Sequence, residues 1–339
     1  MSLAVRGVRV VYGDGGNALK AIDGLDLVVP SGGTLGLVGE SGCGKSTLAR
    51  AIVGLVPLVS GEVTLDGVDF TAQRRRDSLE FRRRVQMIFQ DPYASLNPRM
   101  TTGEMLDEAL ATRGVPSGSA RRAEATHILD LVGLPLTALD RYPHQFSGGQ
   151  RQRIAIARAL GVGPDVIVSD EVTSALDVSV QATILNLLRD LQRDLKLSYL
   201  FISHDLSAVR AMSDVVAVMY LGRIVETAPT DEFFERPEHP YSRALIASVP
   251  RLWAPRAPAA ISGELPDPRQ PPSGCRFHTR CPIGPAASND RQICIEVDPH
   301  LGATERRHAS ACHFAAMQTS VGSHELPSVD AFDRIPGSR

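Results

Sequence analysis

Two hydrophobic patterns divide the first two hundred residues of this 339-residue chain. Apolar and polar positions alternate from Leu3 to Val29, which is typical of strands that bury one face. Short continuous apolar runs follow, each ended by glycine, polar or charged residues, which indicates strands buried on both faces of a parallel sheet. These runs span residues 34–38, 85–89, 166–170 and 199–203. The pattern predicts an α/β core with an N-terminal antiparallel β-subdomain.

A different periodicity occupies residues 100–143. Apolar residues there recur at helical spacing, and Ile128, Leu129 and Val132 fall on one face of a predicted helix. Helical spacing between two apolar runs of the core indicates an insertion rather than a separate domain. We therefore predict a helical subdomain of about residues 92–163 within the α/β core.

The stretch from Gly39 to Thr47, G-E-S-G-C-G-K-S-T, matches the phosphate-binding pattern G-x-x-x-x-G-K-[ST]. Its glycines let the backbone fold tightly, so that successive N–H groups converge on an anion. Lys45 adds an ammonium between the β- and γ-phosphates, and the Ser46 hydroxyl is placed to bind Mg²⁺. Because an apolar run at 34–38 precedes it and a helical pattern at 46–56 follows, a triphosphate is expected at a helix N-terminus.

Polar residues beyond the apolar runs are predicted to complete this site. Gln90 is expected to reach Mg²⁺ or the attacking water, and Asp170 to hold Mg²⁺ through its waters. Glu171 would polarise the attacking water, while His204 either contacts the γ-phosphate or is a surface histidine. Tyr12 either stacks on the adenine ring or packs on the sheet. The predicted nucleotide-binding residues are Tyr12, Gly39, Glu40, Ser41, Gly42, Cys43, Gly44, Lys45, Ser46, Thr47, Gln90 and Asp170. The predicted Mg²⁺ ligands are Ser46, Gln90 and Asp170.

A second helix N-terminus suited to a phosphate begins at the segment Ser147-Gly148-Gly149-Gln150. Ser147 is a good N-cap, and the two glycines expose the N–H groups of the first turn. The chain thus has two predicted phosphate sites but only one recognisable nucleotide loop. We infer that the second site serves the nucleotide of another subunit.

Composition limits the alternatives. Hydrophobic content of 43%, charged content of 22% and a net charge of −2 describe an ordinary globular chain with no basic excess for nucleic acid. Arginines near the N-terminus argue against a secretion signal, and no apolar run approaches the ~20 residues that span a bilayer. A cytosolic protein that reaches the membrane through a partner is therefore expected.

These motifs resemble the ATPase subunit of an ABC transporter over about residues 3–255. The loop, Gln90, S-G-G-Q, Asp170-Glu171, Asp177 and His204 occur in the family's order. The resemblance implies a P-loop NTPase (RecA-like) fold and two such subunits bound head to tail, with each ATP between one loop and the opposite S-G-G-Q signature. In it Asp177 belongs to the D-loop that follows the catalytic carboxylates. One departure is Val172, where similar proteins usually have proline, and it suggests a looser loop after Glu171.

The C-terminal part resembles the extension of the oligopeptide/dipeptide and nickel permease ATPases. The resemblance lies in E-H-P-Y-S-R-A-L at 238–245, in the proline- and cysteine-rich 270–282, and in A-C-H at 311–313. We predict an ATPase domain at 1–255, and a linker and extension at 256–339.

Four cysteines of the extension, spaced C-x₅-C-x₁₂-C-x₁₇-C, have the ligand count of tetrahedral zinc or an iron–sulfur cluster. They are Cys275, Cys281, Cys294 and Cys312. Zinc sites usually contain C-x₂₋₄-C pairs, which are missing here, although His278 or His313 is available as a substitute ligand. The resemblance favours a [4Fe-4S] cluster; zinc and unligated cysteines remain open.

The resulting hypothesis is the ATP-hydrolysing subunit of an importer at the cytoplasmic face of the membrane. It implies MgATP, two membrane permease subunits, a second ATPase subunit (paralogue or self) and, indirectly, an extracytoplasmic solute-binding protein. Di- and oligopeptides are the expected solutes, with nickel or another small solute as the alternative. A soluble ABC ATPase of translation or DNA repair is the rival class, but it usually carries two cassettes or a long coiled coil. A cassette that binds ATP without turnover is a third possibility, against which Glu171 and His204 argue.

Overall fold

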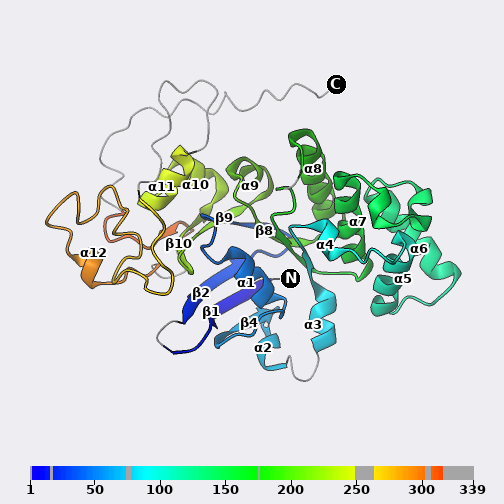
Figure 1. The fold of residues 1–339 in the computed structure, drawn as a ribbon, viewed down its shortest axis with the longest axis horizontal. Helices are drawn as coiled ribbons and strands as arrows, with labels where there is room; N and C mark the ends of the chain where they lie inside the picture. The colour runs from blue at the N-terminus through cyan, green and yellow to red at the C-terminus, as the bar shows by residue number, and fades with distance from the viewer. Residues whose placement is uncertain are drawn as a thin grey trace.

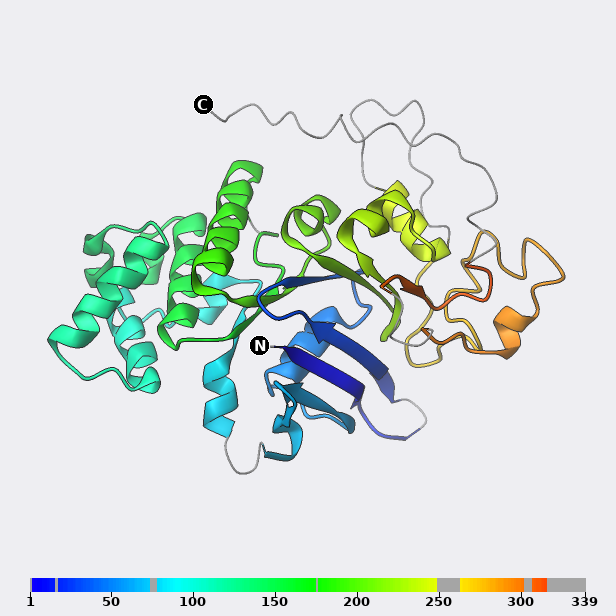
Figure 2. The ribbon, with the colours of Figure 1, turned by 180° about the vertical axis from the view of Figure 1, so that it is seen from behind.

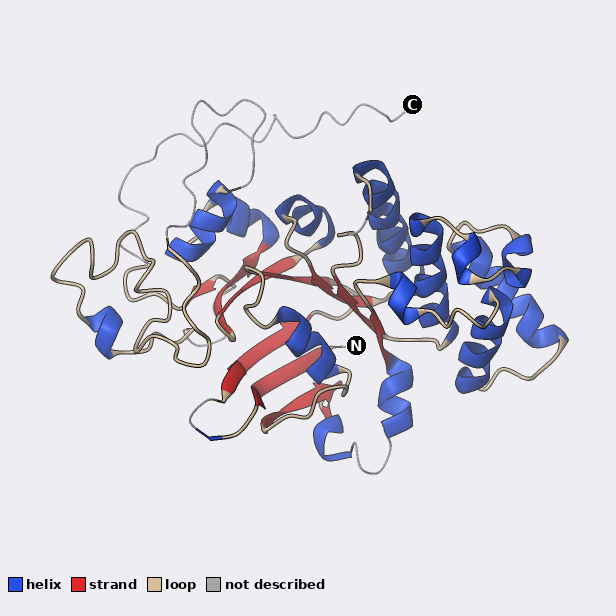
Figure 3. Ribbon diagram, viewed as in Figure 1, coloured by secondary structure: helices blue, strands red, loops and turns tan. Residues whose placement is uncertain are grey.

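The computed structural model describes residues 2–15, 18–73, 78–174, 176–248, 263–301 and 307–315. It contains two β-sheets with helices between them and on one outer face (Figures 1 and 3). No helix in these residues is both long and apolar enough to cross a membrane.

The smaller sheet is the predicted antiparallel subdomain. Its four strands lie in the order β2-β1-β4-β5, and every pair of neighbours is antiparallel. The strands are β1 (Leu3–Tyr12), β2 (Leu19–Val29), β4 (Ser60–Leu65) and β5 (Val68–Asp69). Apolar side chains on one face, such as those of Leu3, Val5, Leu25 and Leu27, are buried, while their polar neighbours face water. The period-two pattern is thereby confirmed.

The larger sheet has seven strands in the order β11-β10-β9-β3-β8-β7-β6. The five from β9 to β6 are parallel, and β10 and β11 are antiparallel additions at one edge. The strands are β3 (Thr34–Val38), β6 (Val85–Ile88), β7 (Val166–Asp170), β8 (Ser198–Ile202), β9 (Val215–Tyr220), β10 (Arg223–Pro229) and β11 (Ala309–Ser310). All residues of β3, β7 and β8 are buried, as the continuous apolar runs predict.

Helix α1 (Lys45–Ile52) packs between the two sheets, and four helices cover the other face of the larger sheet (Figure 3). These are α8 (Val178–Leu195), α9 (Leu206–Met212), α10 (Thr230–Glu235) and α11 (Pro240–Ala247). Two short helices, α2 (Phe70–Gln73) and α3 (Ser78–Arg84), lead into β6. The expected helix at 46–56 ends early, at Ile52, because Gly54 takes a positive φ of 83° that breaks the helical path.

The predicted insertion is helical. It comprises α4 (Pro92–Ser95), α5 (Thr102–Arg113), α6 (Ser119–Leu131), the short 3₁₀ helices η2 (Leu136–Asp140) and η3 (Pro143–Gln145), and α7 (Gly148–Gly161). A capping box between Thr101 and Glu104 begins α5, and Gly114 ends it with a φ of 90°. Ile128, Leu129 and Val132 are buried in the core, as their spacing predicts.

The C-terminal extension lies at the opposite end of the molecule from these helices (Figures 1 and 2). Apart from β11 and α12 (Ile293–Glu296), its described residues are loops and turns. Strand β11 pairs with the edge strand β10, where the fully buried carboxylate of Glu226 lies 2.7 Å from His308 Nε2. Burial raises the pKa of Glu226, but its hydrogen bonds, of which the one with His308 has the largest effect, lower it by more. The pKa of Glu226 is therefore below its ordinary value. Residues 256–262, at the start of the predicted linker and extension, fall outside the described residues.

Candidate nucleotide-binding and hydrolysis site

The phosphate-binding loop joins the buried strand β3 to helix α1, as predicted. Gly39 and Gly44 have φ values of 156° and 112°, which L-amino acids rarely adopt. A Cβ atom would lie 2.2 Å from the Met219 carbonyl oxygen at Gly39 and 2.5 Å from the Ala21 carbonyl oxygen at Gly44. Only glycine fits at these two positions, so the loop is fixed by its packing against β2 and β9.

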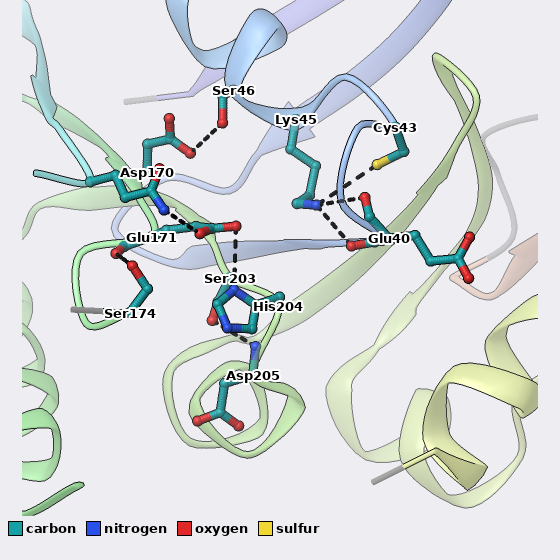
Figure 4. Close-up of polar contacts among 12 residues, drawn as sticks. Glu40, Cys43, Lys45, Ser46, Asp170, Glu171, Ser174, Ser203, His204 and Asp205 are labelled. Atoms are coloured by element: carbon teal, nitrogen blue, oxygen red, sulfur yellow. Dashed lines mark hydrogen bonds and ion pairs between the residues drawn. The ribbon is translucent and has the colours of Figure 1, made fainter. Parts of the chain in front are cut away.

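Lys45 turns back over this loop (Figure 4). Its Nζ donates hydrogen bonds to the carbonyl oxygens of Gly39, at 2.8 Å, and Glu40, at 3.0 Å. The side chain is almost completely buried, and its ammonium lies inside the loop with the Cys43 Sγ at 3.9 Å. A buried cation surrounded by backbone dipoles suits a phosphate group.

Ser46 and Asp170 meet beside the loop. The Ser46 hydroxyl donates to Asp170 Oδ1 at 3.0 Å, so the first turn of α1 and the end of β7 present two oxygen ligands together. Burial, opposed by the hydrogen bond from Ser46, raises the pKa of Asp170 above its ordinary value. A hydroxyl and a carboxylate with little solvent around them fit Mg²⁺, whose charge would keep the carboxylate ionised.

Glu171 lies between two other predicted residues. Gln90 Nε2 donates to Glu171 Oε2 at 2.8 Å, and His204 Nδ1 lies 3.3 Å from Oε1 (Figure 4). The chain ends of β6, β7 and β8 therefore bring these three side chains together, as parallel strands do at one sheet edge. Glu171 has a φ of 49°, and such strained backbone is typical of functional positions.

The loop after Glu171 is closed by hydrogen bonds. Ser174 donates its N–H at 3.1 Å and its hydroxyl at 2.9 Å to the Glu171 carbonyl oxygen. The Val172 side chain is buried in the hydrophobic core. Val172 thus anchors the start of this loop by packing.

Tyr12 and the S-G-G-Q segment lie apart from this cluster. Tyr12 ends β1 with 41% of its surface exposed, which leaves its ring accessible for stacking. Ser147 caps α7 in a capping box with Gln150, and Ser147 and Gly148 are exposed. Within the part of the chain that the structure describes, no hydrogen bond or ion pair joins residues 147–150 to the phosphate-binding loop. Asp177 is exposed in the N-cap position of α8, without a side-chain cap bond.

Comparison with known families and proteins agrees with this geometry. Residues 22–174 match the family model "ABC transporter", and residues 225–287 match "Oligopeptide/dipeptide transporter, C-terminal region". A putative peptide import ATP-binding protein of Brucella ovis is 45% identical over 91% of this chain and 96% of its own length. The chain belongs to the ABC transporter ATP-binding family.

Other members of the family extend the comparison. A probable peptide ABC transporter ATP-binding protein of Sinorhizobium fredii is 46% identical over 94% of this chain and 88% of its own length. Among solved structures, the ATP-binding cassette MJ0796, a dimer in a post-hydrolysis state bound to ADP and Pi, has a TM-score of 0.60 at 27% identity. It covers 67% of this chain and 98% of its own. The transporter component cbiO1 of Clostridium perfringens has a TM-score of 0.61 at 27% identity, covering 69% of this chain and 91% of its own.

The ABC family assignment confirms the predicted P-loop NTPase fold and makes the chain an ATPase. ATP and Mg²⁺ are the expected ligands of such a cassette.

The predicted metal centre of the extension is not supported in this form. No group of three or more His, Cys, Asp or Glu side chains within the described residues is arranged to hold a metal ion. Cys275, Cys281, Cys294 and Cys312, all free thiols, nevertheless line one cavity of about 10 Å³. That volume is about one water-sized sphere, so the thiols must move outward to admit a cluster of several atoms. Burial, with smaller contributions from the other thiols, raises the pKa of Cys275 to about 12, and burial raises that of Cys281 to about 11.

Two residues at the site were missed by the sequence analysis. Tyr241 and Arg280 both contact Glu40, the second residue of the phosphate-binding loop. They lie 201 and 240 residues away in sequence, and no spacing rule connects them to the loop.

Proposed function

We propose that this chain powers the import of di- and oligopeptides through two membrane permease subunits. The observation that carries this proposal is the match of residues 225–287 to the oligopeptide/dipeptide transporter C-terminal region. The ABC transporter match supports ATP hydrolysis alone, while the extension adds the solute class. The relatives in Brucella ovis and Sinorhizobium fredii are named as peptide transporter ATP-binding proteins, which supports the same solute.

In this proposal, the phosphates bind at the loop before α1. The loop N–H groups and Lys45 Nζ neutralise the triphosphate. Ser46, Asp170 and Gln90 would hold Mg²⁺, which supplies charge neutralisation of the β- and γ-phosphate oxygens when bound. Tyr12, exposed at the end of β1, would stack on the adenine ring.

Hydrolysis needs a base beside the γ-phosphate, and Glu171 is the proposed base. Gln90 donates to its Oε2, which orients the carboxylate, and the carboxylate would take a proton from the attacking water. His204, whose Nδ1 lies 3.3 Å from Oε1, would donate a hydrogen bond from a ring N–H to a γ-phosphate oxygen. In this proposal the three groups would hold the attacking water, a base and a hydrogen-bond donor at one sheet edge.

A second ATPase subunit would complete each site. The N-terminus of α7 is capped by its own Ser147 and exposed, so its first-turn N–H groups face outward. The Ser147–Gln150 segment would bind the γ-phosphate held by a partner, and Asp177 would lie at the same interface. The partner is a second copy or a paralogue, and the complex would lie at the cytoplasmic face of the membrane, with a solute-binding protein outside.

Uptake by reconstituted transporter tests this function. The chain, purified with its permease subunits, is placed in proteoliposomes with a solute-binding protein and internal MgATP. Radiolabelled di- and oligopeptides should accumulate, and the Lys45→Ala complex should show no uptake because its loop lacks the phosphate-binding ammonium. Transport of nickel in place of peptides would select the alternative solute. Activity without permeases and no uptake of either would favour a soluble ATPase.

We further propose that the four cysteines of the extension bind an inorganic centre, a [4Fe-4S] cluster or zinc. The four thiols, from separated positions in the sequence, line one cavity. The segment that carries them has few apolar side chains for a hydrophobic core, so a bound metal would stabilise its fold. Bound metal would lower the thiol pKa values that burial raises.

Metal analysis of anaerobically purified protein tests this centre. A cluster predicts brown protein with about four irons per chain, and zinc predicts colourless protein with about one zinc. Cys281→Ser should remove most of the metal and make the extension more sensitive to limited proteolysis. Cys43→Ser, which changes the fifth cysteine outside the extension, should retain the metal. Wild-type protein without metal would refute the proposal.

A further inference from the structure

The C-terminal extension reaches the phosphate-binding loop through one buried side chain. Arg280 Nη1 donates to Glu40 Oε2 at 2.7 Å, and Nη2 donates to Glu40 Oε1 at 3.0 Å. Only 6% of the Arg280 side chain is exposed. Such a two-pronged guanidinium–carboxylate pair fixes the orientation of both groups. The carboxylate of this pair belongs to Glu40, the second residue of the phosphate-binding loop. The extension is therefore attached to the nucleotide site itself.

Glu40 is held at each of its polar groups. Its N–H donates to Tyr241 Oη at 2.8 Å, and its carbonyl oxygen accepts from Lys45 Nζ at 3.0 Å. Its carboxylate points away from Lys45 (Figure 4) and accepts both hydrogen bonds from Arg280. Arg280 thus holds the side chain of the residue whose carbonyl oxygen is hydrogen-bonded to the phosphate-binding ammonium.

Arg280 is itself held by rigid surroundings. The rings of Tyr220, Tyr241 and Phe277 are fully buried and pack on one another, with centroids 4.7 to 5.3 Å apart. The Arg280 guanidinium lies 5.9 Å from the Tyr220 ring centroid, and its Nη1 donates to Tyr220 Oη at 3.4 Å. Phe277 comes from the extension and Tyr220 from β9, so the two parts share one aromatic cluster. Because these rings are tightly packed, Arg280 has little room to move, and a displacement of its guanidinium would displace the Glu40 carboxylate.

We propose that Arg280 is a positioning residue for ATP binding, which acts through Glu40 on the phosphate-binding loop. By this route the C-terminal extension is part of the nucleotide site and not only an appendage. Without the guanidinium, the Glu40 carboxylate would turn toward water to recover its solvation and would draw the loop out of its phosphate-binding shape. The inference rests on ATP binding by the loop, not on the identity of the solute.

The positioning role of Arg280 is tested by equilibrium binding of a fluorescent nucleotide. The Kd of MANT-ATP for the full-length chain is measured in the presence of Mg²⁺. Arg280→Met should raise the Kd about tenfold, which corresponds to ~1.4 kcal/mol. Arg280→Lys should fall between wild type and Arg280→Met, because an ammonium keeps the charge but cannot make both hydrogen bonds. Adding Glu40→Gln to Arg280→Met should restore most of the affinity, because an amide has no charge that must return to water.

A matched control separates positioning from simple attachment of the extension. Arg276 is as buried as Arg280 and docks the same segment, but it contacts Asp23 and the Leu221 carbonyl oxygen, neither of which belongs to residues 39–47. Its link to the loop is indirect and made by backbone groups, since Gly222 N–H donates to the Cys43 carbonyl oxygen at 2.9 Å. Arg276→Met should therefore leave the MANT-ATP Kd within about twofold of wild type. Thermal unfolding of each variant checks that the fold is retained.

The outcomes are distinct. Equal shifts in Kd for Arg280→Met and Arg276→Met would show that Arg280 only docks the extension, and would overturn the inference. Additive losses in the Glu40→Gln/Arg280→Met double variant would overturn it as well. Failure of the wild-type chain to bind MANT-ATP would refute the nucleotide site on which it rests.

Discussion

Replacing Glu171 with glutamine should lower steady-state ATP turnover by about 10²-fold or more. The amide keeps the size of the side chain and can still accept the hydrogen bond that Gln90 donates. It cannot take a proton from water, so the chemical step slows while the phosphate-binding loop remains intact. MANT-ATP should therefore bind with nearly unchanged affinity, and the ATP-bound dimer should accumulate during gel filtration with MgATP.

Asp170→Asn is the matched comparison, because it makes the same carboxylate-to-amide change at the neighbouring position. Asp170 accepts a hydrogen bond from the Ser46 hydroxyl at 3.0 Å, whereas Gln90 and His204 both contact Glu171. This variant should lose the Mg²⁺ dependence of nucleotide binding, whereas Glu171→Gln should keep it. Unchanged turnover in Glu171→Gln, measured on the purified transporter, would remove Glu171 from the role of base.

Local sequence signals account for most of this cassette. The loop at 39–47 and the ends of the apolar runs predict which side chains meet, because parallel strands deliver their C-terminal residues to one edge. Helix starts at Ser147 and Thr101 follow from capping chemistry that needs only neighbouring residues. The end of α1 was placed four residues too late, because a glycine within a helical pattern does not reveal its φ.

The contacts of the extension show where sequence reasoning stops. Arg280 and Glu40 are separated by 240 residues, and their pairing depends on how β9, α11 and the extension pack around Tyr220. No periodicity encodes such a meeting. The cysteines are a related case, since their spacing predicts proximity but not whether four thiols adopt the geometry of metal ligands.

The Ser147–Gln150 segment should act on the nucleotide of the partner subunit, not on that of its own chain. Ser147→Arg places a long cationic side chain at the exposed N-terminus of α7, where it blocks the phosphate and breaks the capping box with Gln150. Loss of these transition-state donors should lower turnover by about 10²-fold. MANT-ATP binding at the variant's own loop should survive, because residues 39–47 are unchanged.

Mixing variants reveals which chain supplies each half of a site. Ser147→Arg and Lys45→Ala subunits are each inactive alone, but a mixed dimer contains one whole site, made from the loop of the first and the signature of the second. With random pairing of equal amounts, half of the dimers carry one whole site of two, so about a quarter of the wild-type sites should return. The control mixes Ser147→Arg with a Ser147→Arg/Lys45→Ala double variant, in which no whole site can form.

Recovery of ATPase activity in the first mixture and not in the control would establish action in trans. If both mixtures stay inactive although gel filtration shows dimers of this chain, each defect belongs to its own nucleotide site and the head-to-tail arrangement is wrong.

Where the purified transporter contains a second ATPase chain, the same cross is made between the two chains, with the lysine change in the paralogue. The head-to-tail arrangement then predicts one whole site when the two changes lie in different chains. When both changes lie in the same chain, it predicts none. The decisive comparison is Ser147→Arg in this chain together with intact partner, where only the partner's nucleotide should fail to turn over.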